Sequence, residues 1–333
     1  MSSLLSVAVV SVIWLSCGTA LAVAQESSGK VPVVGWLTPS TTESYRHSSV
    51  GNPGLAQLRK SLARHGLIDG RTVRIDMRLA EGKLDRLPAL ADGLVREGAT
   101  VILAFGEPAG RAAQAATATV PIVCVADDLA DSGLVADFTR PLRNMTGISI
   151  LATELDIKKI ELLKELLPRA KRFGVLNDPA TGGPQRAQGM TEAARRMGIT
   201  LQMIDVRGPD DLEPAFRAFR SGGAEGVNIV SSAMLTGFRR RLGELSLAAK
   251  IPAVCQFRNM VDVGCLASYG ITITEIYDLS ADQIAKLLKG AKPSELPIEQ
   301  PRKFELSING KTAKALMLSI PNPILLRADA VIQ

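Results

Sequence analysis

The acidic segment 127–131 is the first candidate for chemistry in this sequence. It reads Asp-Asp-Leu-Ala-Asp, a spacing that diphosphate-processing enzymes use to hold divalent metal ions. In those enzymes the motif lies on a helix and faces a second acidic motif, whereas here it follows an apolar, strand-like run and has no partner motif. We therefore expect a strand-end loop that leads into a helix, with a ligand-contacting carboxylate as the alternative, and neither a metal site nor catalysis.

Histidine chemistry is the next candidate, and the chain has only His47 and His65. His65 precedes Gly66 at the end of a helical pattern, where a cation complements the helix dipole. His47 lies in a polar stretch, and neither histidine has a serine or cysteine partner that the sequence identifies. The motifs of phosphate-binding loops, dinucleotide-binding folds, serine hydrolases and zinc proteases are also missing. These patterns predict a protein that is not an enzyme, with no catalytic residues and no cofactor.

Three aromatic residues, Phe105, Phe257 and Tyr269, each end an apolar run. Aromatic residues make up only 4% of the chain, so their position at the ends of strand-like segments is informative. Core filling is one interpretation of these side chains. The other is that one or two of them form an apolar wall for a ligand.

The cysteines do not form an obvious framework. Cys124 and Cys255 occupy equivalent places on two apolar, strand-like runs, where a free cysteine behaves as a small buried hydrophobe. Cys265 is close to Cys255 in sequence, so a disulfide between these two is an alternative. Without Cys17, which lies in a leader described below, three cysteines remain, and an odd number cannot be a complete disulfide framework.

The elements that must position these residues form an internal repeat. In the first half the repeated segments are 33–37, 55–65, 73–77, 84–96, 100–105 and 120–124. Their counterparts in the second half, in the same order, are 173–176, 188–197, 201–206, 210–220, 226–230 and 251–255. Short runs rich in Val and Ile, alternating with helical patterns, are typical of parallel strands buried on both faces. The repeat therefore predicts an α/β protein with two doubly wound parallel-sheet lobes and a ligand cleft between them.

Parallel sheets bind ligands beyond the carboxyl ends of their strands, and the repeat pairs the loops that follow equivalent strands. The paired loops are 38–40 with 177–179, 106–108 with 231–232, and 127–128 with 256–258. The predicted ligand-binding residues are Ser40, Phe105, Gly106, Glu107, Asp127, Asp128, Asn177, Ser231, Ser232, Phe257 and Tyr269. Carboxylates are numerous in this set, which favours a ligand that carries an ammonium group or several hydrogen-bond donors.

Length and charge agree with this organisation. A chain of 333 residues with 46% hydrophobic residues suits two domains of roughly 150 residues each. The net charge is +6, but basic residues are dispersed, and the one tight cluster, 239–241, is typical of a solvated helix face. We expect no nucleic-acid partner.

The N-terminal segment 1–24 has the features of a secretory signal peptide. It contains no charged side chain, has an apolar run over 4–15, and ends in Ala-Val-Ala. The run is shorter than the ~20 residues that a membrane-spanning helix needs. Cys17 makes a lipid anchor the alternative, but Trp14 stands where a lipoprotein signal normally has leucine. We predict a periplasmic protein, exported without a lipid anchor.

The sequence resembles the ABC transporter substrate-binding proteins related to the tryptophan-binding (TrpX-like) type, over nearly all of the mature chain. Segments that carry the resemblance are 86–91, 120–123, 132–135, 144–147, 161–164, 268–270, 284–293, 296–301, 303–309, 311–316 and 325–329. The resemblance implies a type I periplasmic-binding fold, in which the chain crosses three times between its lobes. It also implies an amino acid or similar small ligand, and the permease and ATPase subunits of an importer as partners, with contact to the membrane only through the permease.

The resemblance also suggests how the chain divides between the lobes. We expect 31–147 with 272–292 in lobe 1 and 148–271 with 293–333 in lobe 2. Departures from the family pattern lie at the cleft, where Glu107 stands in place of a small hydroxyl residue and Leu129 in place of proline. The sequence therefore predicts an importer component that binds its ligand by hinge closure but leaves the ligand unnamed. A sensing protein that serves a receptor or sensor kinase is the alternative function.

Overall fold

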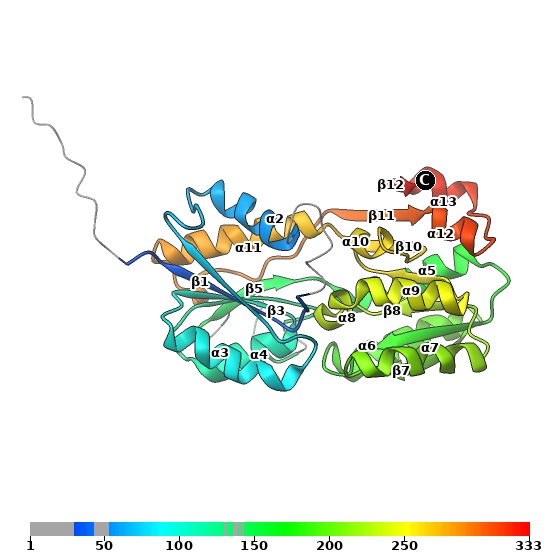
Figure 1. The fold of residues 1–333 in the computed structure, drawn as a ribbon, viewed down its shortest axis with the longest axis horizontal. Coiled ribbons are helices and arrows are strands. Elements are labelled where there is room, and N and C mark those ends of the chain that lie inside the picture. The colour runs from blue at the N-terminus through cyan, green and yellow to red at the C-terminus, as the bar shows by residue number, and fades with distance from the viewer. Residues whose placement is uncertain (1–29, 43–52, 130–131, 136–138, 140, 142) are drawn as a thin grey trace, which may run out of the picture. The chain divides into compact units, whose positions relative to one another are not determined.

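The computed structural model describes residues 30–42, 53–129, 132–135, 139, 141 and 143–333 (Figure 1). The predicted signal peptide, Cys17, His47 and the last two residues of the acidic segment 127–131 lie outside the described residues. Across the described ranges, no helix is both long enough and apolar enough to span a bilayer. The cysteines Cys124, Cys255 and Cys265 are buried and free, so the structure does not contain the alternative disulfide.

Lobe 1 is built on a five-stranded parallel sheet of order β2-β1-β3-β4-β5. Its strands are β1 (Val33–Thr38), β2 (Arg74–Leu79), β3 (Val101–Phe105), β4 (Ile122–Ala126) and β5 (Met145–Ser149). Its helices are α2 (Pro53–Ala63), α3 (Leu87–Arg96), α4 (Glu107–Ala116) and α11 (Ile273–Leu288). Helices α2 and α11 pack together on one face of the sheet and α3 and α4 on the other, each pair over its own apolar core (Figure 1).

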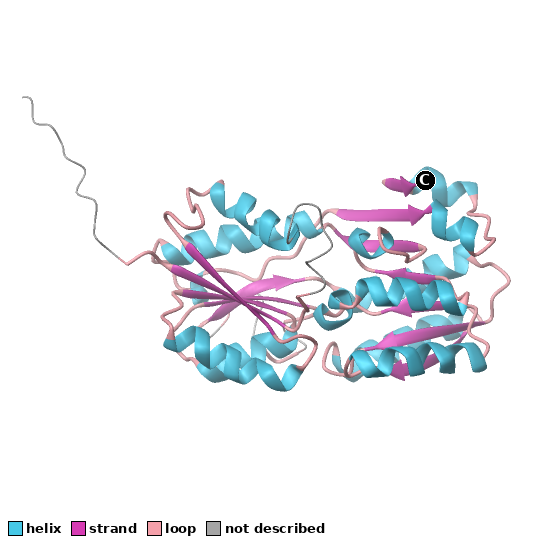
Figure 2. Ribbon diagram, in the orientation of Figure 1, coloured by secondary structure: helices cyan, strands magenta, loops and turns pink. Residues whose placement is uncertain are grey.

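Lobe 2 is built on a seven-stranded sheet of order β12-β11-β10-β9-β8-β6-β7 (Figure 2). Its strands are β6 (Arg172–Asn177), β7 (Thr200–Asp205), β8 (Gly226–Ile229), β9 (Ala253–Cys255), β10 (Ala267–Ile271), β11 (Phe304–Asn309) and β12 (Ala330–Ile332). Its helices are α5 (Ala152–Leu166), α6 (Gly183–Arg196), α7 (Leu212–Ser221), α8 (Ala233–Gly237), α9 (Arg239–Ala249), α10 (Arg258–Val261), α12 (Gly310–Ala315) and α13 (Asn322–Arg327). Only β11 runs antiparallel to its neighbour β10.

The predicted repeat and fold class are confirmed. The order β2-β1-β3-β4 in lobe 1 corresponds to β7-β6-β8-β9 in lobe 2. The first helix of each unit ends at a glycine, Gly66 or Gly198, with φ of 76° and 65°. An added Cβ would meet nothing within 4 Å at either position, so the left-handed backbone conformation is the reason for glycine. The antiparallel strand β11 is an addition that the repeat did not predict.

The chain passes between the lobes three times, after β5, after β10 and before β11. The last passage differs from our expectation, which placed all of 293–333 in lobe 2. Thr146 of β5 donates a hydrogen bond from Oγ1 to the carbonyl oxygen of Leu296 at 2.9 Å, and Glu299 forms a β-bridge with Ile148. Segment 293–299 therefore lies against lobe 1, because its backbone extends the exposed edge at β5.

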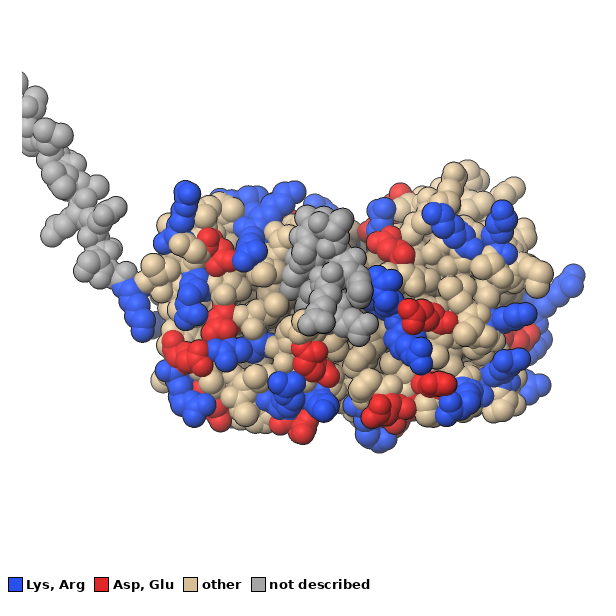
Figure 3. All heavy atoms as spheres, in the orientation of Figure 1, with Lys and Arg blue, Asp and Glu red and all other residues tan. Residues whose placement is uncertain are grey.

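Charged side chains are distributed over both lobes. On the face that Figure 3 shows, Lys and Arg side chains alternate with Asp and Glu side chains and do not merge into one basic surface. The basic cluster 239–241 agrees with this picture, since Arg241 forms ion pairs with Glu213 at 3.3 Å and with Glu244 at 3.9 Å. This face therefore has the mixed charge of a solvated surface and lacks the basic stripe of a nucleic-acid-binding protein.

Candidate functional site

A cavity of about 190 Å³ lies where the loops of the two lobes meet. Its lining residues come from the carboxyl ends of β1, β3, β4, β8 and β9, from α11 and from the start of α2. They include Trp36, Thr38, Ser40, Phe105, Gly106, Asp127 and Tyr277 of lobe 1 and Ser231, Ser232, Ala233, Thr236, Arg239, Phe257 and Asn259 of lobe 2. This is the position at which parallel α/β sheets bind their ligands.

One side of the cavity is an aromatic wall formed by Trp36, Phe105 and Tyr277. The ring centroids lie 5.6 Å apart for Trp36 and Phe105, 5.8 Å for Trp36 and Tyr277, and 5.4 Å for Phe105 and Tyr277. These separations and tilted geometries are the ones that aromatic pairs prefer. A dry cavity of ~150 Å³ accommodates benzene, so this cavity can hold a ring-sized apolar group against the wall. Phe257 completes the apolar lining from lobe 2.

The opposite side of the cavity is polar. Ser231 and Ser232 follow β8, and the side chain of Ser232 accepts a hydrogen bond from the backbone N–H of Leu235 at 3.1 Å, which caps α8. The Ser232 hydroxyl also donates to Asp178 Oδ2 at 2.6 Å. Thr38 ends β1 and Ser40 follows it on the lobe 1 side. Hydroxyl-bearing residues from both lobes therefore line this part of the cavity.

Gly106 brings the two lobes close together beside these hydroxyls. Its φ is 87° and its ψ is 150°, a backbone conformation that glycine alone adopts readily. A Cβ at this position would lie 3.2 Å from the Cβ of Ala233 in the opposite lobe. The glycine is thus required both by the backbone and by the contact between the lobes.

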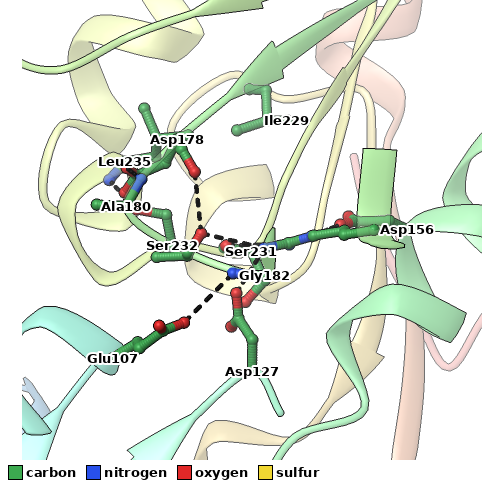
Figure 4. Close-up of polar contacts among 12 residues, drawn as sticks. Glu107, Asp127, Asp156, Asp178, Ala180, Gly182, Ile229, Ser231, Ser232 and Leu235 are labelled. Carbon is green, nitrogen blue, oxygen red and sulfur yellow. Dashed lines mark hydrogen bonds and ion pairs between the residues drawn. The ribbon is translucent and has the colours of Figure 1, made fainter. Parts of the chain in front are cut away.

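Behind the polar side lies a group of buried charges, which we call the charge cluster: Asp127, Asp156, Asp178, Lys159 and Arg186 (Figure 4). Arg186 is its centre, since Nη1 lies 2.5 Å from Asp127 Oδ2 and Nε lies 2.5 Å from Asp156 Oδ2. Arg186 Nη2 also donates to the carbonyl oxygen of Ser231 at 3.0 Å. Asp127 belongs to lobe 1 and the other four members to lobe 2, so the bond between Arg186 and Asp127 joins the lobes.

Lys159 neutralises the other side of Asp156. Its Nζ lies 2.6 Å from Asp156 Oδ1 and donates to the carbonyl oxygen of Ile229 at 2.7 Å. Both charged side chains are fully inaccessible to solvent. Two cations, Arg186 and Lys159, thus face three carboxylates, and the charge cluster carries one negative charge in excess when all five groups are ionised.

Burial affects the titration of two carboxyls in this cluster. Burial raises the pKa of Asp127 to about 6; Arg186 opposes this, and Asp156 adds to it. Burial likewise raises the pKa of Asp178, against the hydrogen bond from Ser232. Asp127 lines the cavity, so a positive group on a ligand placed beside it would balance the charge cluster.

The structure brings seven of the eleven predicted residues together around the cavity: Ser40, Phe105, Gly106, Asp127, Ser231, Ser232 and Phe257. The remaining four do not line it. Glu107 pairs with Arg111 at 2.7 Å and accepts a hydrogen bond from the backbone N–H of Gly182 at 3.4 Å. Asn177 donates to Asp205, and Asp128 lies outside the lining. Tyr269 stacks on Phe304 of lobe 2 with centroids 6.3 Å apart.

Four residues that matter to this geometry were not predicted: Trp36, Tyr277, Asp156 and Arg186. Trp36 lies within a strand and Tyr277 within a helix far along the chain, so neither stands at a strand end. Arg186 follows two consecutive glycines, Gly182 and Gly183, at the start of α6. Two consecutive glycines are the one feature of the sequence that could have indicated an unusual loop beside Arg186.

Comparisons with known proteins agree with this architecture. The family described as ABC transporter substrate binding protein matches residues 52–332. A tyrosine-binding protein of Clostridioides difficile is 23% identical over 303 residues, which cover 86% of this chain and 87% of that protein. A conserved domain protein of Vibrio cholerae has 24% identity and a TM-score of 0.79, with 91% of this chain and all of that chain covered.

An ABC domain from Streptococcus pneumoniae in complex with L-Trp has 23% identity and a TM-score of 0.78, with 91% of this chain and all of that chain covered. These solved structures show that the two lobes form the type I periplasmic-binding fold. The family match covers most of the sequence, including the elements of both lobes that surround the cavity except β1 and the loop that follows it. With two α/β lobes and a cavity between their strand ends, the chain belongs to the ABC transporter substrate-binding protein family.

Proposed function

We propose that this chain is the extracytoplasmic solute-binding component of an ABC importer and that its ligand is an amino acid with an aromatic side chain. One observation carries the choice of ligand. The cavity has an aromatic wall on one side and, on the other, Asp127 of a charge cluster that lacks one positive charge. An aromatic amino acid carries the ring that fits the wall and the ammonium group that balances the cluster.

The names of two similar proteins support this choice. One is a tyrosine-binding protein and the other was solved in complex with L-Trp. Hydroxyls of Ser40, Ser231 and Thr38 line the cavity, and the ligand's carboxylate would lie on their side of it. No step of bond making or breaking is proposed, because this family binds solutes and is not a class of enzymes.

Binding would operate by closure of the lobes around the ligand. Residues of both lobes line the cavity, so a ligand that contacts both shifts the equilibrium toward the closed form. Contacts between the lobes in the structure are ones that closure would form, including a hydrogen bond of 3.2 Å from Thr41 Oγ1 to the carbonyl oxygen of Gly237. The three passages between the lobes would serve as the hinge. The permease and ATPase subunits would then receive the closed, loaded protein.

A thermal-shift screen tests this proposal. A ligand that binds only the folded protein at 100 times its Kd adds about 2.7 kcal/mol of stability, which is several degrees of melting temperature. We expect L-tyrosine, L-tryptophan or L-phenylalanine to raise the melting temperature and aliphatic amino acids to have a smaller effect. The proposal fails if no aromatic amino acid shifts the melting temperature while another class of solute does.

A further inference from the structure

We propose that Arg186 is a positioning residue for ligand binding. Lobe 2 presents its guanidinium to lobe 1, where it keeps the Asp127 carboxylate ionised when the lobes are closed. The ligand's ammonium group then meets a fixed, charged carboxylate. This inference rests on the proposed function and adds to it the residue that prepares the site for a cation.

Lobe 2 holds the Arg186 side chain rigidly. Its Nε is bound by Asp156, its Nη2 donates to the carbonyl oxygen of Ser231, and its Nη1 donates to Thr181 Oγ1 at 3.1 Å. The side chain is only 1% exposed, so it is fixed by packing as well as by hydrogen bonds. Nη1 is also the atom that reaches Asp127 across the lobe interface, at 2.5 Å. The guanidinium is therefore a preorganised donor whose partner arrives from the other lobe.

The backbone before α6 is shaped to let this side chain pass. Gly182 and Gly183 have φ values of 71° and 56°, in the left-handed region. A Cβ on Gly182 would lie 2.3 Å from Arg186 Cδ, a distance that real Cβ atoms do not show. The backbone N–H of Gly182 also donates to Glu107 Oε2 of lobe 1 at 3.4 Å. The same short loop thus makes room for Arg186 and forms a second contact between the lobes.

Asp127 needs this partner because its surroundings are otherwise unfavourable for a negative charge. Its side chain is buried, with the residue 7% exposed, and Asp156 from α5 and Asp178 from the loop after β6 are both acidic. Ser231 from the loop after β8 supplies a hydrogen bond, and Arg186 from α6 supplies the nearby positive charge. Without Arg186, closure would bury an unpaired carboxylate, and such a group takes up a proton instead. A protonated Asp127 would no longer attract an ammonium group.

The lobe 2 core does not depend on Arg186 for its charge balance. Asp156 keeps Lys159 as a partner at 2.6 Å when Arg186 is replaced. The substitution Arg186→Gln should therefore leave the fold intact. Arg196→Gln is a matched control, because Arg196 lies on the same helix but forms an exposed ion pair with Glu192, at 2.9 Å, and does not line the cavity.

The experiment measures the distance between spin labels on Asp85→Cys in lobe 1 and Glu244→Cys in lobe 2, with and without L-tyrosine, together with the Kd for L-tyrosine by calorimetry. We expect Arg186→Gln to open the ligand-free protein at pH 7.5 and to raise the Kd at least tenfold, and Arg196→Gln to change neither. Adding Asp127→Asn to Arg186→Gln should close the ligand-free protein again, since the carboxylate that resists burial is gone.

A purely structural role for Arg186 would not produce that rescue, so an open double variant overturns the inference. The pH dependence of the Kd is a second criterion. Since a nearby opposite charge lowers a carboxyl pKa by about 1–3, the midpoint of this dependence should move upward by at least about one pH unit in Arg186→Gln. An unmoved midpoint also overturns the inference.

Two further outcomes remain informative. If L-tyrosine does not bind the wild-type protein, the proposed function fails, and the ligand-free distances still decide the role of Arg186. If Arg186→Gln does not fold, Gly182→Ala displaces the same side chain without removing a charge and should give the same opening. A closed Gly182→Ala protein would then overturn the inference.

Discussion

The substitution Asp127→Asn should make the ligand-free protein more stable while it weakens ligand binding. Burial raises the pKa of Asp127 to about 6 from the ordinary value of 3.8. A carboxyl with a higher pKa in the folded than in the unfolded chain stabilises the fold when it is protonated. The stability of the wild-type protein should therefore rise as the pH falls from about 6 to about 4. Asparagine imitates the protonated carboxyl and should keep that stability at every pH.

The magnitude follows from the two pKa values. A difference of one pKa unit corresponds to about 1.4 kcal/mol, so ionised Asp127 costs at most about 3 kcal/mol in the folded protein. For a chain of this size a gain of 1 kcal/mol raises the melting temperature by roughly 2–4 °C. Asp127→Asn should thus melt several degrees above the wild type at pH 8. A hydrogen bond to a charged group contributes about 1.5–3 kcal/mol, so the Kd for L-tyrosine should rise about 10- to 100-fold.

The assay is differential scanning calorimetry between pH 4 and pH 8, with Asp128→Asn as the control. Asp128 is the next residue in sequence and does not line the cavity. The control should bind L-tyrosine as tightly as the wild type does. The reasoning is refuted if Asp127→Asn melts below the wild type at pH 8, or if the two variants bind L-tyrosine with the same affinity.

Three further substitutions test other parts of the site. Phe105→Ala should weaken binding of an aromatic amino acid by about 1–3 kcal/mol in calorimetry, because it removes part of the aromatic wall, whereas Phe304→Ala should have no effect. Gly106→Ala should cost about 1–3 kcal/mol of backbone strain and raise the Kd, since its Cβ also pushes against lobe 2; unchanged binding would contradict this. Lys159→Met breaks a fully buried ion pair and should lower the free energy of unfolding by about 3–5 kcal/mol, measured by denaturant titration. A loss below about 1 kcal/mol would show that the protein does not need this ion pair for its stability.

The fold could be predicted from sequence because its signal is repeated. Apolar runs of similar length recur in both halves, and glycines end the first helices at Gly66 and Gly198 with the same backbone conformation. The passage before β11 could not be predicted in this way. Segment 293–299 has no periodic pattern of its own, and it lies against lobe 1 through single contacts such as that of Thr146 with Leu296.

The site was predictable only as far as it consists of strand ends. Asp127, Ser231 and Phe257 follow strands, and the rule that parallel sheets bind ligands at these ends places them correctly at the cavity. The sequence-based prediction of a cationic ligand counted carboxylates without their partners. Glu107 is paired with Arg111 in its own helix, so only the buried charge cluster contributes an unbalanced carboxylate. Pairing of this kind depends on side chains from distant segments, which no local pattern reveals.

Isothermal titration calorimetry with L-tyrosine and its desamino analogue, 3-(4-hydroxyphenyl)propionate, tests the central claim most directly. The two compounds share the ring and the carboxylate and differ only in the ammonium group that should meet Asp127. We expect one site per chain for L-tyrosine and an affinity for the analogue that is weaker by about 1.5–3 kcal/mol, or 10- to 100-fold. Equal affinity for the two compounds, or no binding of L-tyrosine, L-tryptophan or L-phenylalanine, would contradict it.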